Sequence, residues 1–363
     1  MKEPLVSVVT PVFNGEDYLA ECIESVLGQS YTNWEYTIVN NCSTDASFEI
    51  ATRYAGLDSR IRVVNNPVFL NQIQNLNNSL RQISSESKYC KMVLADDWIF
   101  PNCLSEMVKV AEMDSGIGLV SAYRLIENEV HSDGLPYDQS IFSGNNIGRN
   151  YLLYRHNHFG SQSSVLFRSD LVRREHSFFN EDEVHADTSV FLKIVSESKF
   201  GFVHQVLSFS RRSNLEKSTS SFAHYYDTYS LSYLDFMIKY GSRFLNPEEH
   251  TREYKKLLYR HYRKMIGYLF RLKGVNVLSY HLSEMKNMGI KHRIGLIFKA
   301  VLVETLLIFS NLKKMAIAAG LMIRNERHSK SGTIEFYKNN TSVSSLDSSK
   351  ERKRERAVSE SFS

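Results

Sequence analysis

The sequence lacks the glycine-rich motifs with which many α/β proteins hold phosphates. No G-x-G-x-x-G follows the first predicted strand, and no G-x-x-x-x-G-K-[ST] occurs anywhere in the 363 residues. The first motif places a dinucleotide pyrophosphate against a helix N-terminus, and the second surrounds the phosphates of a nucleotide. A dinucleotide-binding domain and a P-loop nucleotidase are therefore both disfavoured.

Cysteine and excess charge are also scarce. The four cysteines, Cys22, Cys42, Cys90 and Cys103, do not pair at metal-ligand spacing, so we expect reduced thiols in a cytosolic protein. The 44 basic and 40 acidic residues leave a formal net charge of only +4. Because nucleic-acid-binding domains usually carry a dense basic stripe, we expect no nucleic-acid partner. The N-terminus reads as the start of a strand and lacks the long apolar region of a signal peptide.

No apolar run approaches the roughly 20 residues that a membrane-spanning helix needs. Residues 292–323 contain shorter apolar runs, which charges such as Lys299 and Glu304 interrupt. One alternative is an amphipathic helix in peripheral contact with the cytoplasmic face of an anionic membrane, and the other is helices that pack on the rest of the protein. Residues 326–363 are rich in Ser, Lys and Glu and have no periodic apolar face, so we expect a disordered tail.

Short apolar runs alternate with helical patterns as far as residue 123. The expected strands are Val6–Thr10, Trp34–Val39, Ile61–Val64, Cys90–Ala95 and Ile117–Tyr123, and the helices between them span residues 16–27, 45–54, 71–83 and 102–113. This alternation is typical of an α/β fold in which helices cover both faces of a mostly parallel sheet. We also expect Asn14 to cap the first helix, residues 127–149 to form a loop, and Asn246-Pro247 to start a later helix.

Polar residues follow three of the expected strands. They are the segments Pro11–Asn14, Asn40–Ser43 and Asp96-Asp97. Because parallel strands end at one edge of the sheet, these segments should gather there, at the place where an open α/β sheet holds its ligand. Two adjacent carboxylates repel each other, and a hard divalent cation that also binds substrate phosphates is a natural partner for them.

The same segments carry a resemblance to a known family. The N-terminal run P-L-V-S-V-V-T-P-V-F-N-G-E-D-Y-L-A-E-C-I-E-S-V-L-G-Q-S-Y is followed by V-N-N-C-S-T-D and then by L-A-D-D. This ordered series resembles the family 2 glycosyltransferases of the GT-A fold over roughly Pro4 to Ser220. The resemblance implies a GT-A type sheet and transfer of a sugar from a nucleoside-diphosphate donor to an acceptor, with inversion at the anomeric carbon.

The resemblance also implies roles for the donor side of the site. Pro11, Phe13 and Asn14 stand in the first-strand motif that cradles the nucleotide base, and the family usually has Tyr where Phe13 stands. Asn41 replaces an Asp that normally accepts a hydrogen bond from the uracil ring, so weaker donor binding or a different base is an alternative. By analogy Asp96 contacts the ribose, and Asp97 binds the Mg²⁺ or Mn²⁺ held by the diphosphate.

On the acceptor side, Asp187 matches the carboxylate that serves as the general base in the family. It begins a helical pattern with an apolar face at residues 190–195, and without the resemblance it would read as a carboxylate that favours the helix dipole. The neighbouring acids at residues 181–183 fall too early against that pattern. Arg212 is the predicted contact for the leaving diphosphate, with the adjacent Arg211 as the alternative, although Ser213 stands where many members have His.

These observations predict an inverting glycosyltransferase with three regions. Residues 1–220 form the catalytic domain, residues 221–325 a helical region, and residues 326–363 the tail. A UDP-sugar donor is favoured, with a saccharide or lipid-linked saccharide acceptor, as in cell-surface polysaccharide assembly. Many members carry another Asp where Leu94 stands. This departure and those at Asn41 and Ser213 support an alternative, a degenerate member that binds nucleotide sugar or membrane without catalysis. A sugar nucleotidyltransferase is disfavoured because residues 11–15 do not form a glycine-rich basic loop.

Overall fold

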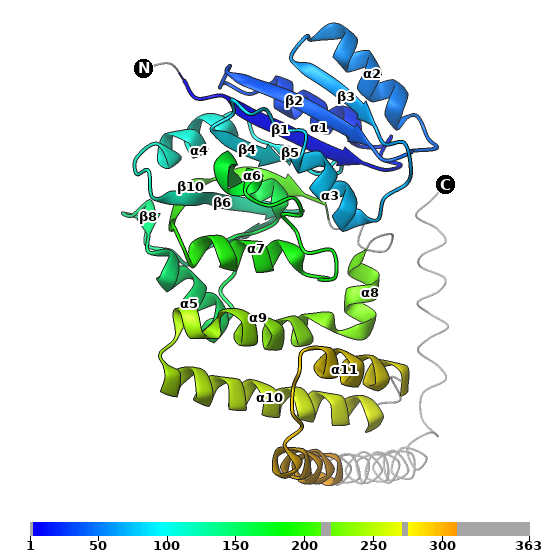
Figure 1. Cartoon of the computed structure of the whole chain (residues 1–363), viewed down its shortest axis with the longest axis vertical. Helices are drawn as coiled ribbons and strands as arrows, with labels where there is room; N and C mark the ends of the chain where they lie inside the picture. The colour runs from blue at the N-terminus through cyan, green and yellow to red at the C-terminus, as the bar shows by residue number, and fades with distance from the viewer. Residues whose placement is uncertain (1–2, 212–218, 271–274, 311–363) are drawn as a thin grey trace, which may run out of the picture. The chain divides into compact units, whose positions relative to one another are not determined.

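The fold is taken from a computed structural model that describes residues 3–211, 219–270 and 275–310 (Figure 1). The chain divides into two compact units, residues 1–293 and 294–363. The first unit contains a sheet of ten strands and the helices that cover it. The predicted boundary near residue 220 falls inside this unit, and it stays a prediction about the division by function.

The N-terminal half of the sheet is parallel, as the alternation of strands and helices predicts. Its strands are β1 (Val6–Val12), β2 (Trp34–Asn40), β3 (Ile61–Asn65) and β4 (Tyr89–Met92). They lie side by side in the order β3-β2-β1-β4. Every residue of β1 and β4 is buried, because helices cover both faces of the sheet and leave no solvent side.

The other half of the sheet is mixed. It contains β5 (Trp98–Ile99), β6 (Ile117–Ile126), β7 (Glu129–His131), β8 (Ile141–Phe142), β9 (Leu166–Arg168) and β10 (Lys199–Ser210). The order continues as β4-β9-β6-β10-β5, in which β9 runs antiparallel to both of its neighbours. Because β6 and β10 are parallel to each other and to β4, the sheet as a whole remains mostly parallel.

Helices lie on both faces of the sheet (Figure 1). They are α1 (Leu19–Leu27), α2 (Ser47–Leu57), α3 (Gln72–Leu80), α4 (Cys103–Ala111), α5 (Gly144–Tyr154), α6 (Ser169–Arg173) and α7 (Ala186–Val195). The predicted cap at Asn14 is wrong, because α1 begins only after Tyr18. Asn14 instead has a left-handed backbone (φ 48°), which Asn tolerates better than most residues, and its side chain binds a neighbouring turn.

The predicted loop at residues 127–149 is only partly correct. It contains the short strands β7 and β8, and α5 begins within it at Gly144. A side chain at Gly144 would meet the backbone oxygens of Val195 and Ser198 at 2.1 Å, so only glycine allows this close packing. Asn, Gly and Arg dominate the first turns of α5, and this composition conceals the helix in the sequence.

Four helices follow the sheet within the first unit. They are α8 (Thr219–Tyr226), α9 (Thr228–Phe244), α10 (Pro247–Phe270) and α11 (Val275–Asn287). The predicted start of α10 is confirmed, because the Glu249 N–H donates to the Asn246 side chain at 2.9 Å. α9 packs on α5 and α7, and the hydroxyls of Ser189 and Tyr240 lie 2.9 Å apart across that contact. α9 therefore packs on the sheet domain.

Two buried histidines join α10 to α11. His281 Nε2 lies 2.6 Å from the Tyr226 carbonyl and must donate to it, so in the neutral ring Nδ1 accepts. His261 Nε2, 3.2 Å from that Nδ1, is then the donor. His261 Nδ1 is left as a buried acceptor without a hydrogen-bond partner in the described residues. The pair is therefore built for two neutral rings.

This pair predicts a contribution to stability that is lost as the pH falls. Burial and the nearby His281 lower the pKa of His261 to about 3. The positive charge of Lys264 lowers this pKa further, and the negative charge of Asp227 raises it. Below the ordinary pKa of His, near 6.5, the unfolded chain binds a proton that the folded chain does not. The free energy of unfolding therefore decreases as the pH is lowered below that value. Between pH 6.5 and 5 one such group costs about 2 kcal/mol.

Urea unfolding at pH 7 and at pH 5 measures this loss as the difference between the two free energies of unfolding, which is compared between the unchanged protein and its variants. We expect His261→Gln to flatten the difference, and the exposed His176→Gln to behave as the unchanged protein does. Equal losses in His261→Gln and the unchanged protein would contradict the role of the pair.

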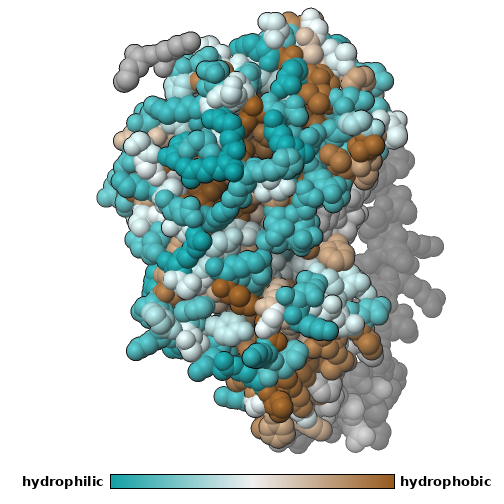
Figure 2. Space-filling view, in the orientation of Figure 1, coloured by the Kyte–Doolittle hydropathy of each residue, from teal (hydrophilic) through white to brown (hydrophobic). Residues whose placement is uncertain are grey.

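The described part of the second unit is a helix over residues 294–310. Several of its apolar side chains are at the surface, including Ile294 (82% exposed), Phe298 (70%) and Phe309 (65%). Figure 2 shows hydrophobic residues over this helix. No helix within the described ranges is long and apolar enough to cross a bilayer. The predicted disordered tail lies outside the described residues.

Candidate functional site

The turns after β1 and β2 are tied together at the carboxyl edge of the sheet. The Thr44 N–H donates to Asn14 Oδ1 at 2.8 Å, and the Asn14 N–H donates to Ser43 Oγ at 3.0 Å. The Gly15 N–H in turn donates to Ser47 Oγ at 2.8 Å. The sequence therefore brings its first two predicted segments together, as expected for the ends of adjacent parallel strands.

The third segment joins them through the turn between β4 and β5. A Cβ built on Gly15 would lie 3.5 Å from the Ala95 side chain, so the first turn touches the residue before the carboxylate pair. Thr10 Oγ1 also donates to the Val93 carbonyl at 2.8 Å. Pro11 is buried inside β1, and Phe13 projects from the end of that strand with 48% of its surface exposed. All three predicted segments thus meet at one edge.

Asp97 is the buried member of the carboxylate pair, with only 6% of its surface exposed. Its N–H donates to the Leu94 carbonyl at 3.0 Å, which fixes the turn after β4. Burial raises the pKa of Asp97 to about 7, and the negative charge of Asp96 adds to this increase. The Arg124 guanidinium lowers that pKa without cancelling the effect of burial.

The two carboxylates fit a hard divalent cation. Burial and mutual repulsion disfavour the charged form of Asp97, and a bound cation removes both costs. Magnesium is commonly held by one or two carboxylates together with substrate phosphates. Within residues 3–211, 219–270 and 275–310 no group of three or more His, Cys, Asp or Glu side chains offers a complete metal site. The donor's diphosphate would therefore have to supply ligands.

Lys91, which the sequence analysis missed, anchors the segment beneath this turn. It lies on β4 and is fully buried, and its Nζ donates to the Ser163 and Val165 carbonyls at 2.7 and 3.1 Å. Ser163 Oγ then accepts from the Leu94 N–H at 3.0 Å. Burial lowers the pKa of Lys91. A lysine in a short apolar run gives little warning of such a role, because lysine is rarely buried without a partner.

Removing this amine should destabilise the protein. Lys91→Met fills similar volume but leaves two buried carbonyls without a donor, and each unsatisfied group costs about 1–3 kcal/mol. We expect Lys91→Met to lower the free energy of unfolding by about 2–5 kcal/mol in urea titrations. The matched control is Lys88→Met, which removes an exposed ion pair with Glu112 (2.6 Å) worth about 0–1 kcal/mol. Similar losses in both variants would contradict the anchoring role.

Asp187 lies in the first turn of α7, as the sequence predicts. Its Oδ1 accepts from the Thr188 N–H at 2.7 Å, which orients the carboxylate. The preceding His185 is 2.9 Å from the Thr228 hydroxyl, and its ring lies 4.3 Å from that of Tyr229. The start of α9 therefore closes one side of the surroundings of Asp187.

Arg124, on β6, links the two sides of the site. Burial lowers the pKa of its guanidinium, whereas the negative charges of Asp97 and Asp187 both raise it. Its Nε is buried and has no hydrogen-bond partner among the described residues. Two carboxylates that are distant in the sequence therefore act on the same buried cation. The sequence analysis did not single out Arg124, because an arginine near the end of a strand has no distinguishing pattern.

The rival carboxylates before α7 have structural partners. Glu181 accepts from Gln74 Nε2 at 3.1 Å, and Glu183 pairs with Lys239 of α9 at 2.8 Å. These contacts fasten the 179–183 segment to α3 and α9. Asp187 is thus the acid of this segment that interacts with Arg124.

Of the two predicted basic residues after β10, only Arg211 is described. It forms an ion pair with Glu21, and its guanidinium lies 4.3 Å from the centre of the Tyr18 ring. Arg211 therefore packs beside α1, close to the first turn of the site. Arg212 lies outside the described residues, and its predicted contact with the diphosphate stays a prediction.

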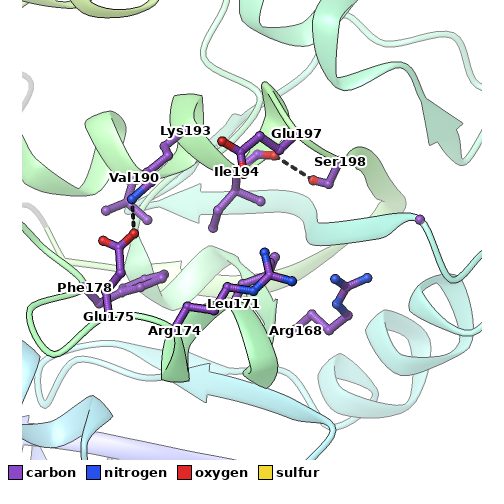
Figure 3. A pocket seen from close by; sticks show the side chains of 11 residues that line it. Arg168, Leu171, Arg174, Glu175, Phe178, Val190, Lys193, Ile194, Glu197 and Ser198 are labelled. Atoms are coloured by element: carbon purple, nitrogen blue, oxygen red, sulfur yellow. Dashed lines mark hydrogen bonds and ion pairs between the residues drawn. The ribbon is translucent and has the colours of Figure 1, made fainter.

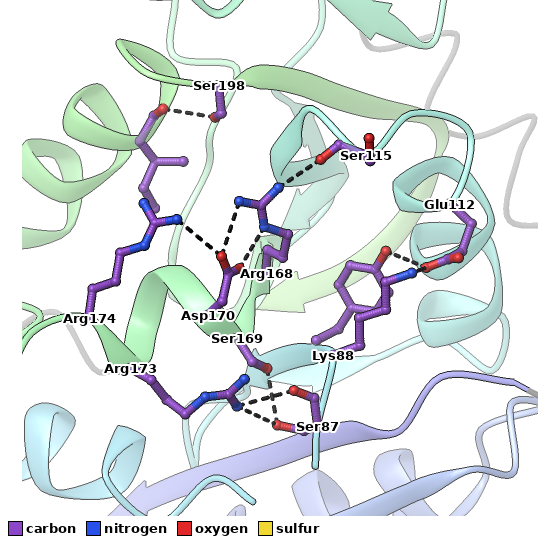
Figure 4. A network of polar contacts seen from close by, with 12 residues as sticks. Ser87, Lys88, Glu112, Ser115, Arg168, Ser169, Asp170, Arg173, Arg174 and Ser198 are labelled. Carbon is purple, nitrogen blue, oxygen red and sulfur yellow. Dashed lines mark hydrogen bonds and ion pairs between the residues drawn. The ribbon is translucent and has the colours of Figure 1, made fainter. Parts of the chain in front are cut away.

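A separate pocket of about 350 Å³ lies between α6 and α7 (Figure 3). Its position at the amino ends of β6 and β10 is opposite to the edge that carries Asp97. The basic side chains that line this pocket already pair with carboxylates of the protein. Arg168 binds Asp170 through two hydrogen bonds of 2.6 and 3.2 Å, and Arg174 contacts the same carboxylate (Figure 4). Lys193 pairs with Glu175 (Figure 3). This pocket is therefore a poor candidate for binding a diphosphate.

Comparison with known proteins decides the family. Residues 7–175 match the model of glycosyl transferase family 2. Residues 7–175 therefore form a domain of glycosyltransferase family 2. The resemblance inferred from the motif series is thereby confirmed for this part of the chain.

Several proteins are similar to this glycosyltransferase. An uncharacterized glycosyltransferase of Haemophilus influenzae is 29% identical over 200 residues, which cover 53% of this chain and 60% of that protein. TuaG of Bacillus subtilis is 48% identical over 62 residues, covering 17% and 25%. The fold is similar to that of S. aureus TarS 1-349 in complex with UDP-GlcNAc (TM-score 0.56, 16% identity, 78% and 80% covered). The chain thus spans less than two thirds of the length of these curated relatives, and the structural likeness supports the GT-A fold.

Proposed function

We propose that this glycosyltransferase moves a sugar from a nucleoside-diphosphate donor to the hydroxyl of a saccharide or lipid-linked saccharide acceptor, with inversion. The observation that carries the proposal is the position of the buried Arg124 on β6, where the negative charges of both Asp97 and Asp187 act on it. One carboxylate lies among the strand-end turns of the donor side, and the other starts the helix of the acceptor side. The donor and the acceptor would bind between these two carboxylates.

In this proposal Asp187 is the general base. Its carboxylate accepts the proton of the acceptor hydroxyl while that oxygen attacks the anomeric carbon on the face opposite the leaving diphosphate. The Thr188 N–H donates to Oδ1, and no hydrogen bond within the described residues is made to Oδ2, so Oδ2 can take the proton. A positioned base of this kind contributes about 10²–10⁴-fold to the rate.

The donor side would hold the nucleotide. Phe13 offers a ring for the base, Asn14 shapes the first turn, and Asp96 contacts the ribose. Asp97 is the proposed ligand of Mg²⁺ or Mn²⁺, which when bound supplies Lewis-acid stabilisation of the departing diphosphate. Arg124, buried between the two sides, balances the negative charge that gathers there.

The printed names of similar proteins support the substrate classes. TarS forms a complex with UDP-GlcNAc, which favours a UDP-sugar donor here. The name of TuaG refers to teichuronic acid biosynthesis, which favours a role in cell-surface polysaccharide assembly. The exposed apolar face of residues 294–310 contains the basic Lys299 and follows Lys291 and Arg293 in sequence, and it supports peripheral contact with an anionic membrane.

A panel of nucleotide sugars tests the proposal. We expect one donor, with Mn²⁺ present, to protect the full chain against thermal unfolding, and the same donor to release nucleoside diphosphate when an acceptor is added. Protection without any release, across saccharide and lipid-linked acceptors, would favour the alternative of a degenerate binding protein. No protection by any nucleotide sugar would overturn the proposed donor site.

A further inference from the structure

The Asn41 side chain has no acceptor left for the imide N–H of a nucleotide base. Its Oδ1 accepts from the Leu70 N–H and from Asn66 Nδ2, both at 2.9 Å. Its Nδ2 donates to the Leu70 carbonyl at 2.8 Å. A carbonyl oxygen has two lone pairs, and here both are used. Asn41 is also buried, with 3% of its surface exposed.

These bonds hold the loop of residues 66–71 between β3 and α3. The Asn66 N–H donates to the Asn40 carbonyl at 2.9 Å, so the loop is fixed to the end of β2. Asn66 also donates to Asn75 Oδ1 at 3.0 Å and accepts from Asn78 Nδ2 at 2.7 Å, which fixes the loop to α3. A loop fastened on both sides loses little further conformational entropy when a ligand binds.

The loop presents an aromatic ring at the carboxyl edge of the sheet. Phe69 is 59% exposed, although it is a large apolar residue on a firmly held loop. Its ring centre lies 4.9 Å from that of Phe13, with 63° between the two planes. Phe13 ends the first strand and is itself 48% exposed. Two exposed rings in contact beside the carboxylate turn form a ready surface for a flat, aromatic ligand.

We infer that Phe69 and Phe13 together bind the base of the donor by stacking, and that Asn41 is a positioning residue that holds Phe69 in place. This inference rests on the proposed function, because it assigns the base to the same edge of the sheet. Stacking accepts any base, whereas a hydrogen bond to the imide of uracil would select it. In this chain residue 41 therefore supports the stacking surface and does not read the identity of the base.

An Asp at position 41 separates the two roles. A carboxylate only accepts hydrogen bonds, so Asn41→Asp loses the bond to the Leu70 carbonyl and sets two oxygens against each other. In calorimetry with Mn²⁺ we expect Asn41→Asp to lower the affinities for UDP and for ADP by the same factor. The loop that carries Phe69 becomes less firmly held, and this affects the stacking of either base. If residue 41 read the uracil imide, the charged acceptor would instead tighten UDP and leave ADP unchanged, and that result would overturn the inference.

Surface variants test the stacking directly without disturbing the core. We expect Phe69→Ala to lower the binding affinity for both nucleotides roughly 5- to 150-fold, the usual range for one base–aromatic stack. Val68→Ala is the matched control, because Val68 is a neighbouring exposed residue (62%) without a ring. In the double variant, adding Asn41→Asp to Phe69→Ala should cause little further loss, since Asn41 acts through Phe69.

The outcomes for the two proposals are distinguishable. Failure of the unchanged protein to bind any nucleoside diphosphate with Mn²⁺ would overturn the proposed function, and the inference with it. Normal binding by the unchanged protein, with full affinity retained in Phe69→Ala, would overturn the inference and leave the proposed function standing. Full additivity in the double variant would remove Asn41 from its positioning role.

Discussion

Asp187→Asn should lower turnover by about 10²–10⁴-fold while the affinity for nucleotide sugar stays unchanged. The amide has nearly the shape of the carboxylate and can still accept from the Thr188 N–H, so α7 should begin as before. It cannot take a proton from the acceptor hydroxyl, because an amide oxygen is far too weak a base. Steady-state rates of diphosphate release, together with calorimetric donor affinity, measure the two effects separately.

Asp182→Asn is the matched control for this change. Asp182 is an exposed acid five positions earlier in the same segment, and its loss should leave both turnover and donor affinity as they are. Equal turnover of Asp187→Asn and the unchanged protein would remove Asp187 from the proposed role. A drop confined to donor affinity would show instead that this carboxylate acts in binding.

Asp97→Ala should abolish the metal-dependent part of donor binding. Without that carboxylate the turn after β4 keeps only Asp96. The repulsion between Asp96 and Asp97, which a bound cation would relieve, is then absent. A divalent ion held by one or two carboxylates loses a large part of its protein ligands when one is removed. Titration of the nucleotide sugar with and without Mn²⁺ should show a clear difference for the unchanged protein and none for the variant.

Because Asp97 is buried, its replacement needs a check on folding. Asp97→Asn fills the same volume, and Asp58→Ala removes an acid that only pairs with the exposed Arg60. We expect all three proteins to unfold cooperatively, with the metal effect retained in Asp58→Ala alone. Retention of the Mn²⁺ effect in both Asp97 variants would contradict the proposed metal site.

The parts of the fold that the sequence predicts are those with local signals. The parallel strands β1 to β4 are short β-branched or apolar runs between helical patterns, so the sequence predicts each of them. Because parallel strands end at the same edge of a sheet, the place where the polar turns meet follows from that prediction. Asn246-Pro247 starts α10 as predicted because capping depends on neighbouring residues. Asp187 was placed at the start of α7 by the apolar helical pattern of residues 190–195 that follows it.

The features that sequence reasoning missed depend on long-range contacts. Lys91 is buried because carbonyls of residues 163 and 165 meet it, and nothing near position 91 indicates that. The orientation of Asn41 toward Leu70 depends on how the β3–α3 loop folds back on β2. Asn14 fails as a helix cap because its side chain is already bonded across to Thr44.

The position of β9 has a consequence for how the protein is made. This three-residue strand pairs with β4 on one side and with β6 on the other, through Leu166 and Phe167. The ribosome releases β4 and β6 before β9, so the two halves of the sheet have no shared hydrogen bonds until that later segment emerges. We expect the emerging N-terminal half to form its parallel strands early and to keep an open β4 edge during synthesis, a state in which chaperone binding or mispairing with another nascent chain would compete with correct assembly.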